Sequence, residues 1–206
     1  MPAPFLEGTT YACYYYDVYC KVGQRVEDKH LLTTSPERWI DVSVSEEFSQ
    51  LVSEEWLSEV ALKTLQVALS KSVPGQVSIV ISDDACIKEL NSKYRGLNEV
   101  TDVLAFSSIH GGHWEGDLSD ITHNRDNLED FVLPPDQIPP LGEVIISYPQ
   151  SVRQAAENNH SVNQEIAVLT AHGILHLIGH DHMDNKDAIV MQSKEHDIAS
   201  LIGVEE

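Results

Sequence analysis

Residues 171–182 read AHGILHLIGHDH, and this stretch decides how the rest of the chain is interpreted. Four of the ten histidines in the chain fall within it, interleaved with aliphatic residues. His172 and His176 are four residues apart, so on a helix both rings leave the same face. Gly179 permits the left-handed turn that ends such a helix. His182 follows three residues later and can return to the same point.

The spacing of these three histidines, HxxxHxxGxxH, is the ligand frame of metzincin zinc sites. Three neutral imidazoles leave one tetrahedral position open, which is typical of a catalytic zinc rather than a closed structural one. The sequence therefore predicts one zinc ion per chain, held by His172, His176 and His182. Ordinary core histidines and a purely structural metal are the alternatives. His180, in the turn, is a further candidate as a ligand or a proton shuttle.

The residue that follows the first histidine argues against one class of enzyme. Zinc proteases with this frame carry glutamate there, as the general base for the metal-bound water. Here the position is Gly173. Peptide hydrolysis by the usual route therefore lacks its base, which argues against a protease. Asp181 lies beside a predicted ligand, and three roles are open to it: a base, an orienting residue and a turn cap.

Outward from this motif, hydrophobic periodicity and turn residues predict a mixture of strands and helices without a regular βαβ alternation. The fold class is therefore α+β, a small sheet of about four strands with helices packed on it. The zinc site lies on a C-terminal helix and the turn after it. Strands are predicted at 39–45, 77–82, 100–108 and 142–147, and helices at 54–71, 83–96, 148–160, 161–179 and 185–203.

Two segments do not follow this pattern. Residues 1–36 show little periodicity and are predicted to be an N-terminal extension of unassigned role, so the main domain spans 37–206. Residues 109–140 are polar, broken by proline and glycine, and carry seven acidic residues against Arg125 alone. Such a composition cannot bury a core. We expect a mobile acidic insertion there, with a functional lid as the alternative.

Composition limits the compartment and the partners. No segment approaches the roughly 18 unbroken apolar residues that a membrane span needs, and the N-terminus lacks the basic region of a secretory signal. Three cysteines without a CxxC motif fit reduced thiols, so we expect a cytoplasmic protein. The formal net charge of −20 by itself argues against nucleic acid as a partner. A local basic cleft can nevertheless bind RNA on an acidic body.

Three motifs together resemble the YbeY family of bacterial endoribonucleases, also called rRNA maturation factors. In chain order, which is also the family's order, they are NSKYRGLNEVTDVLAFS (91–107), LGEVIIS (141–147) and HGILHLIGHDH (172–182). The resemblance covers roughly residues 39–206 and does not reach the N-terminal extension. The acidic insertion is longer than the short connection associated with the family. The family's fold is α+β with a small mixed sheet, in agreement with the periodicity.

The resemblance implies a zinc-dependent endoribonuclease, specific for single strands, that acts in rRNA maturation at the 3′ end of the small-subunit species and in ribosome quality control. Single-stranded RNA would be its substrate, and the ribosome or ribosomal proteins its partners. By motif position, His172, His176 and His182 carry over as zinc ligands and Arg95 as the catalytic arginine. A guanidinium can grip phosphate oxygens with two hydrogen bonds and stays charged. Another metal hydrolase and a non-catalytic ribosome-associated factor are the competing readings.

Overall fold

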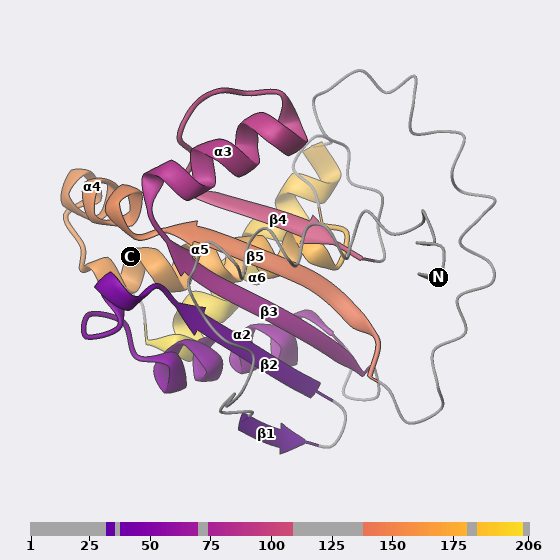
Figure 1. Cartoon of the computed structure of the whole chain (residues 1–206). Coiled ribbons are helices and arrows are strands. Elements are labelled where there is room, and N and C mark those ends of the chain that lie inside the picture. The colour runs from indigo at the N-terminus through magenta and orange to yellow at the C-terminus, as the bar shows by residue number, and fades with distance from the viewer. Residues whose placement is uncertain (1–31, 36–37, 70–73, 109–137, 181–184, 204–206) are drawn as a thin grey trace, which may run out of the picture.

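The structure is a computed structural model, and it shows one mixed sheet with helices on both faces (Figure 1). It describes residues 32–35, 38–69, 74–108, 138–180 and 185–203. Within these ranges, no helix combines the length and the apolar character needed to cross a membrane. The two segments predicted as an extension and an insertion lie almost wholly outside them, so both stay predictions.

Five strands form the sheet, in the order β1-β2-β3-β5-β4. The inner pairs β2–β3 and β3–β5 are parallel, whereas the outer strands β1 and β4 run antiparallel to their neighbours. The predicted α+β class is confirmed. The sheet has one strand more than predicted, because the four residues of β1, LTTS, carry too little alternation to be recognised. The strands are β1 (Leu32–Ser35), β2 (Arg38–Val44), β3 (Gly75–Ser82), β4 (Val103–Ser107) and β5 (Pro140–Ser147).

Five α-helices and one short 3-10 helix, η1, are described. Helices α2 to α5 each begin after a side chain that accepts a hydrogen bond from a backbone N–H of the first turn, which satisfies a donor that the helix itself cannot. These capping residues are Ser53, Asp83, Ser147 and Ser161. The helices are η1 (Glu46–Phe48), α2 (Glu54–Ala68), α3 (Asp84–Arg95), α4 (Tyr148–Asn158), α5 (Val162–Leu177) and α6 (Asn185–Ile202).

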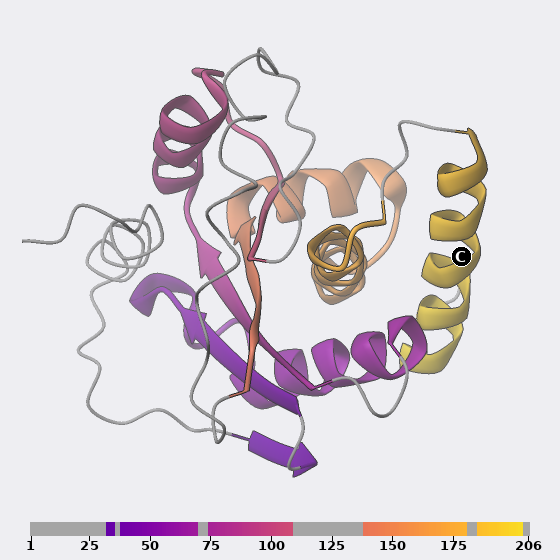
Figure 2. The ribbon, with the colours of Figure 1, turned by 90° about the vertical axis from the view of Figure 1, so that its right-hand side faces the viewer.

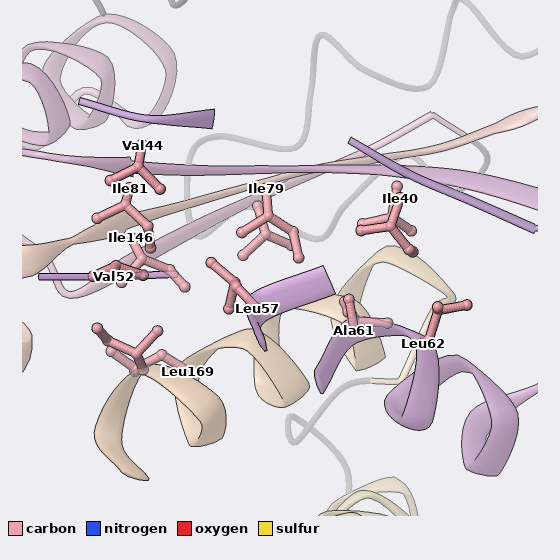
Figure 3. Packing of buried hydrophobic residues seen from close by; sticks show 14 of the residues in the cluster. Ile40, Val44, Val52, Leu57, Ala61, Leu62, Ile79, Ile81, Ile146 and Leu169 are labelled. Carbon is pink, nitrogen blue, oxygen red and sulfur yellow. The ribbon is translucent and has the colours of Figure 1, made fainter. Parts of the chain in front are cut away.

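The two faces of the sheet carry separate apolar cores. Helix α3 lies on one face, and α2, α4, α5 and α6 lie on the other (Figure 2). The larger core joins the sheet to α2 and α5; Figure 3 shows Leu57 and Leu169 directed at Ile79 and Ile146 of the sheet. The smaller core lies under α3 and consists of Val80, Ile87, Leu90, Leu104 and Ile145.

Helix α5, which carries the histidine motif, runs through the middle of the helical layer (Figure 2). The sheet, α2, α4 and α6 surround it, so most of its side chains are buried. An amphipathic surface helix would show polar residues along one whole face. Here the half-buried side chains of His172 and His176 lie near the C-terminal end of the helix. The two rings therefore lie among buried neighbours, because Gly173, Ile174, Leu175 and Leu177 are all buried.

Candidate functional site

The rings of His172 and His176 meet near the C-terminal end of α5. Their Nε2 atoms are 3.0 Å apart. The ring centroids are 4.6 Å apart, with the planes at 79° to each other. Both side chains are half-buried, so the rings are reachable from solvent. The structure thus brings together two of the three histidines predicted as metal ligands.

The separation of these two nitrogens suits a shared zinc ion. Two Zn–N bonds of about 2.0–2.1 Å at a tetrahedral angle place the nitrogens about 3.3–3.4 Å apart. The observed 3.0 Å is a few tenths of an ångström shorter. The third predicted ligand, His182, and the neighbouring Asp181 lie outside the described residues. Among the residues that are described, no group of three or more His, Cys, Asp or Glu side chains is placed to hold a metal.

Glu195 of α6 contacts the edge of the His172 ring that lies away from His176. Its Oε1 accepts a hydrogen bond from His172 Nδ1 at 2.8 Å. Because an ionised carboxylate can only accept, Nδ1 is the nitrogen that donates here, and in the neutral form of the ring Nε2 then keeps its lone pair. A histidine that binds a metal through Nε2 needs this form, and an acceptor behind the ring is the usual way to fix it. Glu195 lies 23 residues beyond His172 and is not among the site residues predicted from the sequence.

The turn after α5 has the geometry that the sequence predicted. Gly179 adopts a φ of 91°. The N–H groups of Gly179 and His180 donate to the carbonyls of His176 and Leu175, at 3.1 and 3.0 Å. This pair of hydrogen bonds is a Schellman motif, which needs a left-handed residue at the position of Gly179. The helix therefore ends within three residues of His176, and His180 lies half-buried in the turn.

Gly173 faces the sheet, and this explains why it cannot carry the base of a zinc protease. A Cβ atom at this position would lie 2.5 Å from Cγ1 of Val144, closer than real Cβ atoms approach. Glycine is therefore what allows α5 to lie against β5 at this point. Glu195 is the carboxylate that contacts His172, but it touches the ring at Nδ1 and not on the Nε2 side. Neither position supplies the protease base.

The end of α5 is attached to the edge of the sheet. Ser107, the last residue of β4, donates its hydroxyl to the carbonyl of Leu177 at 2.7 Å. Gly142 of β5 has a φ of 145°, and a Cβ there would lie 2.2 Å from the Phe106 carbonyl oxygen and 2.8 Å from Cδ2 of Leu177. The glycine of the LGEVIIS motif thus makes room for both neighbours. The histidine pair is held at one end of β4.

Arg95 is the last residue of α3, and Gly96, with a φ of 71°, ends that helix. Since α3 and α5 cover opposite faces of the sheet, Arg95 and the histidines do not share a face (Figure 2). The end of α3 does meet the end of β4: the Tyr94 and Phe106 rings contact each other edge to face, with centroids 5.5 Å apart. Phe106 directly precedes Ser107. The arginine and the histidine helix therefore approach the same end of an edge strand from two sides (Figure 1).

The family model and three curated relatives that resemble this chain share one name. The family model described as "Endoribonuclease YbeY" matches residues 39–203. A curated relative of that name from Dehalococcoides mccartyi is 44% identical over 163 residues, which are 78% of this chain and 93% of the relative. Another, from Desulforamulus reducens, is 36% identical over 164 residues, 80% of this chain and 92% of the relative. A third, from Roseiflexus sp., is 34% identical over 169 residues, 82% of this chain and 95% of the relative.

Proposed function

The chain belongs to the YbeY endoribonuclease family, and on that premise we propose that it is a zinc-dependent endoribonuclease that cleaves single-stranded RNA. We propose that it acts in rRNA maturation, at the 3′ end of the small-subunit species, and in ribosome quality control. Its partners would be the ribosome or ribosomal proteins, and its compartment the cytoplasm. The relatives' shared name and the three sequence motifs support the RNA substrate.

The observation that carries the proposal is the histidine pair with its carboxylate. Two Nε2 atoms lie 3.0 Å apart, and an acidic side chain on another helix accepts a hydrogen bond from Nδ1 of one ring. In this proposal His172, His176 and His182 hold one zinc ion per chain. When bound, zinc supplies a Lewis acid that polarises a phosphoryl oxygen or activates water. Peptide hydrolysis is a poorer proposal, because Gly173 stands where a zinc protease carries its general base.

Arg95 would bind the scissile phosphate from the other side of β4. A guanidinium offers a planar pair of donors to phosphate oxygens and keeps its charge at every relevant pH. Lys93 lies in the same helical turn, with its ammonium 5.1 Å from the centroid of the Tyr94 ring. These positive side chains lie on a chain with a formal charge of −20. We therefore expect weak binding of free RNA, with ribosomal partners supplying the remaining affinity.

The experiment that tests the proposal combines metal analysis with RNA cleavage on the full chain. The wild type should carry one divalent ion and cut single-stranded but not double-stranded RNA. His176→Ala should lose both the ion and the cleavage. His196→Ala is the matched control, because His196 is an exposed histidine on α6, and it should keep both.

Two results would contradict different parts of the proposal. Full metal occupancy in His176→Ala would show that the ligand assignment is wrong. A zinc-loaded wild type that leaves single-stranded RNA intact would refute the nuclease activity. The ends of the products also identify the attacking group, because attack by the RNA's own 2′-hydroxyl leaves a cyclic phosphate and attack by water does not.

A further inference from the structure

We propose that Glu195 is the positioning residue of the metal site, and that it sets metal affinity by fixing the proton and the orientation of the His172 ring. The inference rests on the proposed function, because it assumes that His172 binds a metal. It adds a part of the site that lies on a separate helix, α6. The contact that carries it is the 2.8 Å hydrogen bond between Glu195 Oε1 and His172 Nδ1.

The packing of α6 on α5 places Glu195 beside the His172 ring. Met191 and Ile198 of α6 are buried and pack on Ala171 and Leu175 of α5. Glu195 lies four residues after Met191 and three before Ile198, so it shares their face of the helix. Its side chain is 35% exposed and that of His172 is 32% exposed, so neighbouring atoms shield most of this hydrogen bond from water. The carboxylate is therefore held at the ring by the same contacts that hold the two helices together.

A second anchor fixes α6 next to Glu195. The ammonium of Lys194 donates to the carbonyl of Ala68, at the end of α2, at 3.2 Å. That carbonyl belongs to the last turn of α2, where backbone acceptors have no partner within the helix. Helix α6 is thus attached to both α2 and α5 on either side of the carboxylate. A positioning residue needs this kind of rigid support.

The geometry of the histidine pair shows what the carboxylate controls. The Nε2 atoms of His172 and His176 face each other at 3.0 Å, so only one of them can carry a hydrogen between them. In the neutral form of the His172 ring, donation from Nδ1 to Glu195 leaves Nε2 without a hydrogen, so that Nε2 is the acceptor of the pair. Without Glu195, His172 is free to move its proton to Nε2. A proton on Nε2 occupies the lone pair that a metal would use.

Other roles for Glu195 conflict with its position. A metal ligand or a general base would have to lie on the Nε2 side of the ring, where the two histidines converge. The carboxylate instead contacts Nδ1, on the opposite edge. It therefore acts through His172.

The test measures metal affinity and the protonation of His172 separately, on the full chain. Zinc affinity is measured by competition with a chelator, and the protonated ring nitrogen of His172 by ¹H–¹⁵N NMR of the metal-free protein. Glu195→Ala should weaken zinc binding by about 10–100-fold and shift the His172 proton from Nδ1 towards Nε2. Asp197→Ala, which removes an exposed acid of the same helix, should change neither quantity.

Glu195→Gln keeps the shape of the side chain and an acceptor oxygen but removes the charge, so it should lose less affinity than Glu195→Ala. If Glu195→Ala does not fold, Glu195→Gln decides on its own: weaker zinc binding supports the inference and wild-type affinity overturns it. If Glu195→Ala folds, an affinity within twofold of the wild type, or an unchanged His172 proton, overturns it. If the wild type binds no zinc, the proposed metal site fails, while the NMR measurement still decides whether Glu195 fixes the ring.

Discussion

Replacing Gly173 by alanine tests whether the approach of α5 to the sheet is as tight as the structure shows. In most helix interiors this change stabilises a protein by about 1 kcal/mol, because alanine loses less backbone entropy on folding. Here the new methyl group would lie 2.5 and 3.0 Å from Cγ1 and Cγ2 of Val144. Ordinary carbon contacts are about 3.5–4.0 Å, so the atoms must separate by roughly 1 Å.

Val144 cannot turn away from the new methyl group. It is fully buried and β-branched, so its χ1 is restricted and a change of rotamer would meet the atoms packed around it. Helix α5 cannot easily move away either, since the Ser107 hydroxyl holds its last residue. Overpacking of this kind costs about 1–3 kcal/mol. Set against the helix gain of about 1 kcal/mol, Gly173→Ala should lower the free energy of unfolding by up to about 2 kcal/mol.

A double-mutant cycle with Val144→Ala separates this clash from any other effect. Val144→Ala alone removes two buried methyl groups and should cost about 1–3 kcal/mol. In that background the alanine at position 173 has room, so Gly173→Ala should become stabilising by up to about 1 kcal/mol. The measurement is urea unfolding of the four metal-free proteins, with the slope of each transition compared. A stabilising effect in the wild-type background, or the same effect in both backgrounds, would refute the reasoning.

Arg95→Lys should keep the fold and the metal but slow RNA cleavage by roughly a hundred- to a thousandfold, because an ammonium cannot reproduce the two-pronged grip on phosphate. Melting temperature, metal content and single-turnover cleavage are measured on one preparation, and a near wild-type rate, or a loss of activity matched by unfolding, would exclude the catalytic role. Replacing residues 109–137 by a short turn should leave the melting temperature unchanged. Its flanks are already neighbours in the sheet, since the Ser108 N–H donates to the Leu141 carbonyl at 2.9 Å, and its composition cannot bury a core. A large drop in melting temperature would show that the segment packs on the domain.

Features encoded by neighbouring residues were predictable from the sequence. The predicted helix 83–96 is bounded by Asp83 and Gly96, where the structure has an aspartate cap and a left-handed glycine. The predicted helix 161–179 likewise begins at Ser161, which caps it, and Gly179 supplies the predicted left-handed turn after its end. Capping chemistry acts within one helical turn, so the sequence contains all of it. Helix 54–71 was predicted three residues too long, because the backbone of Leu69 is already extended.

Features that depend on contacts distant in sequence were not predictable. Glu195 gave no signal, because a single glutamate on a helix is usually a solvated residue and only the packing of α6 on α5 places it at His172. Periodicity does not encode which face of a sheet a helix covers, so it did not place Arg95 and the histidines on opposite faces. The predicted strand 100–108 is shorter in the structure, where β4 spans Val103–Ser107.

The strand order also determines when during synthesis the site can assemble. β4 is made before β5, yet its one described partner in the sheet is β5, which inserts between β4 and β3. Until residues 140–147 have emerged, β3 therefore presents an unpaired apolar edge, the kind of edge that promotes aggregation of incomplete chains. The helix that carries His172 and His176 emerges later still and needs the finished β4–β5 edge to attach to. A nascent chain should therefore gain its nuclease site only after all strands of the sheet have paired. Incomplete chains still on the ribosome would then be unable to cut RNA.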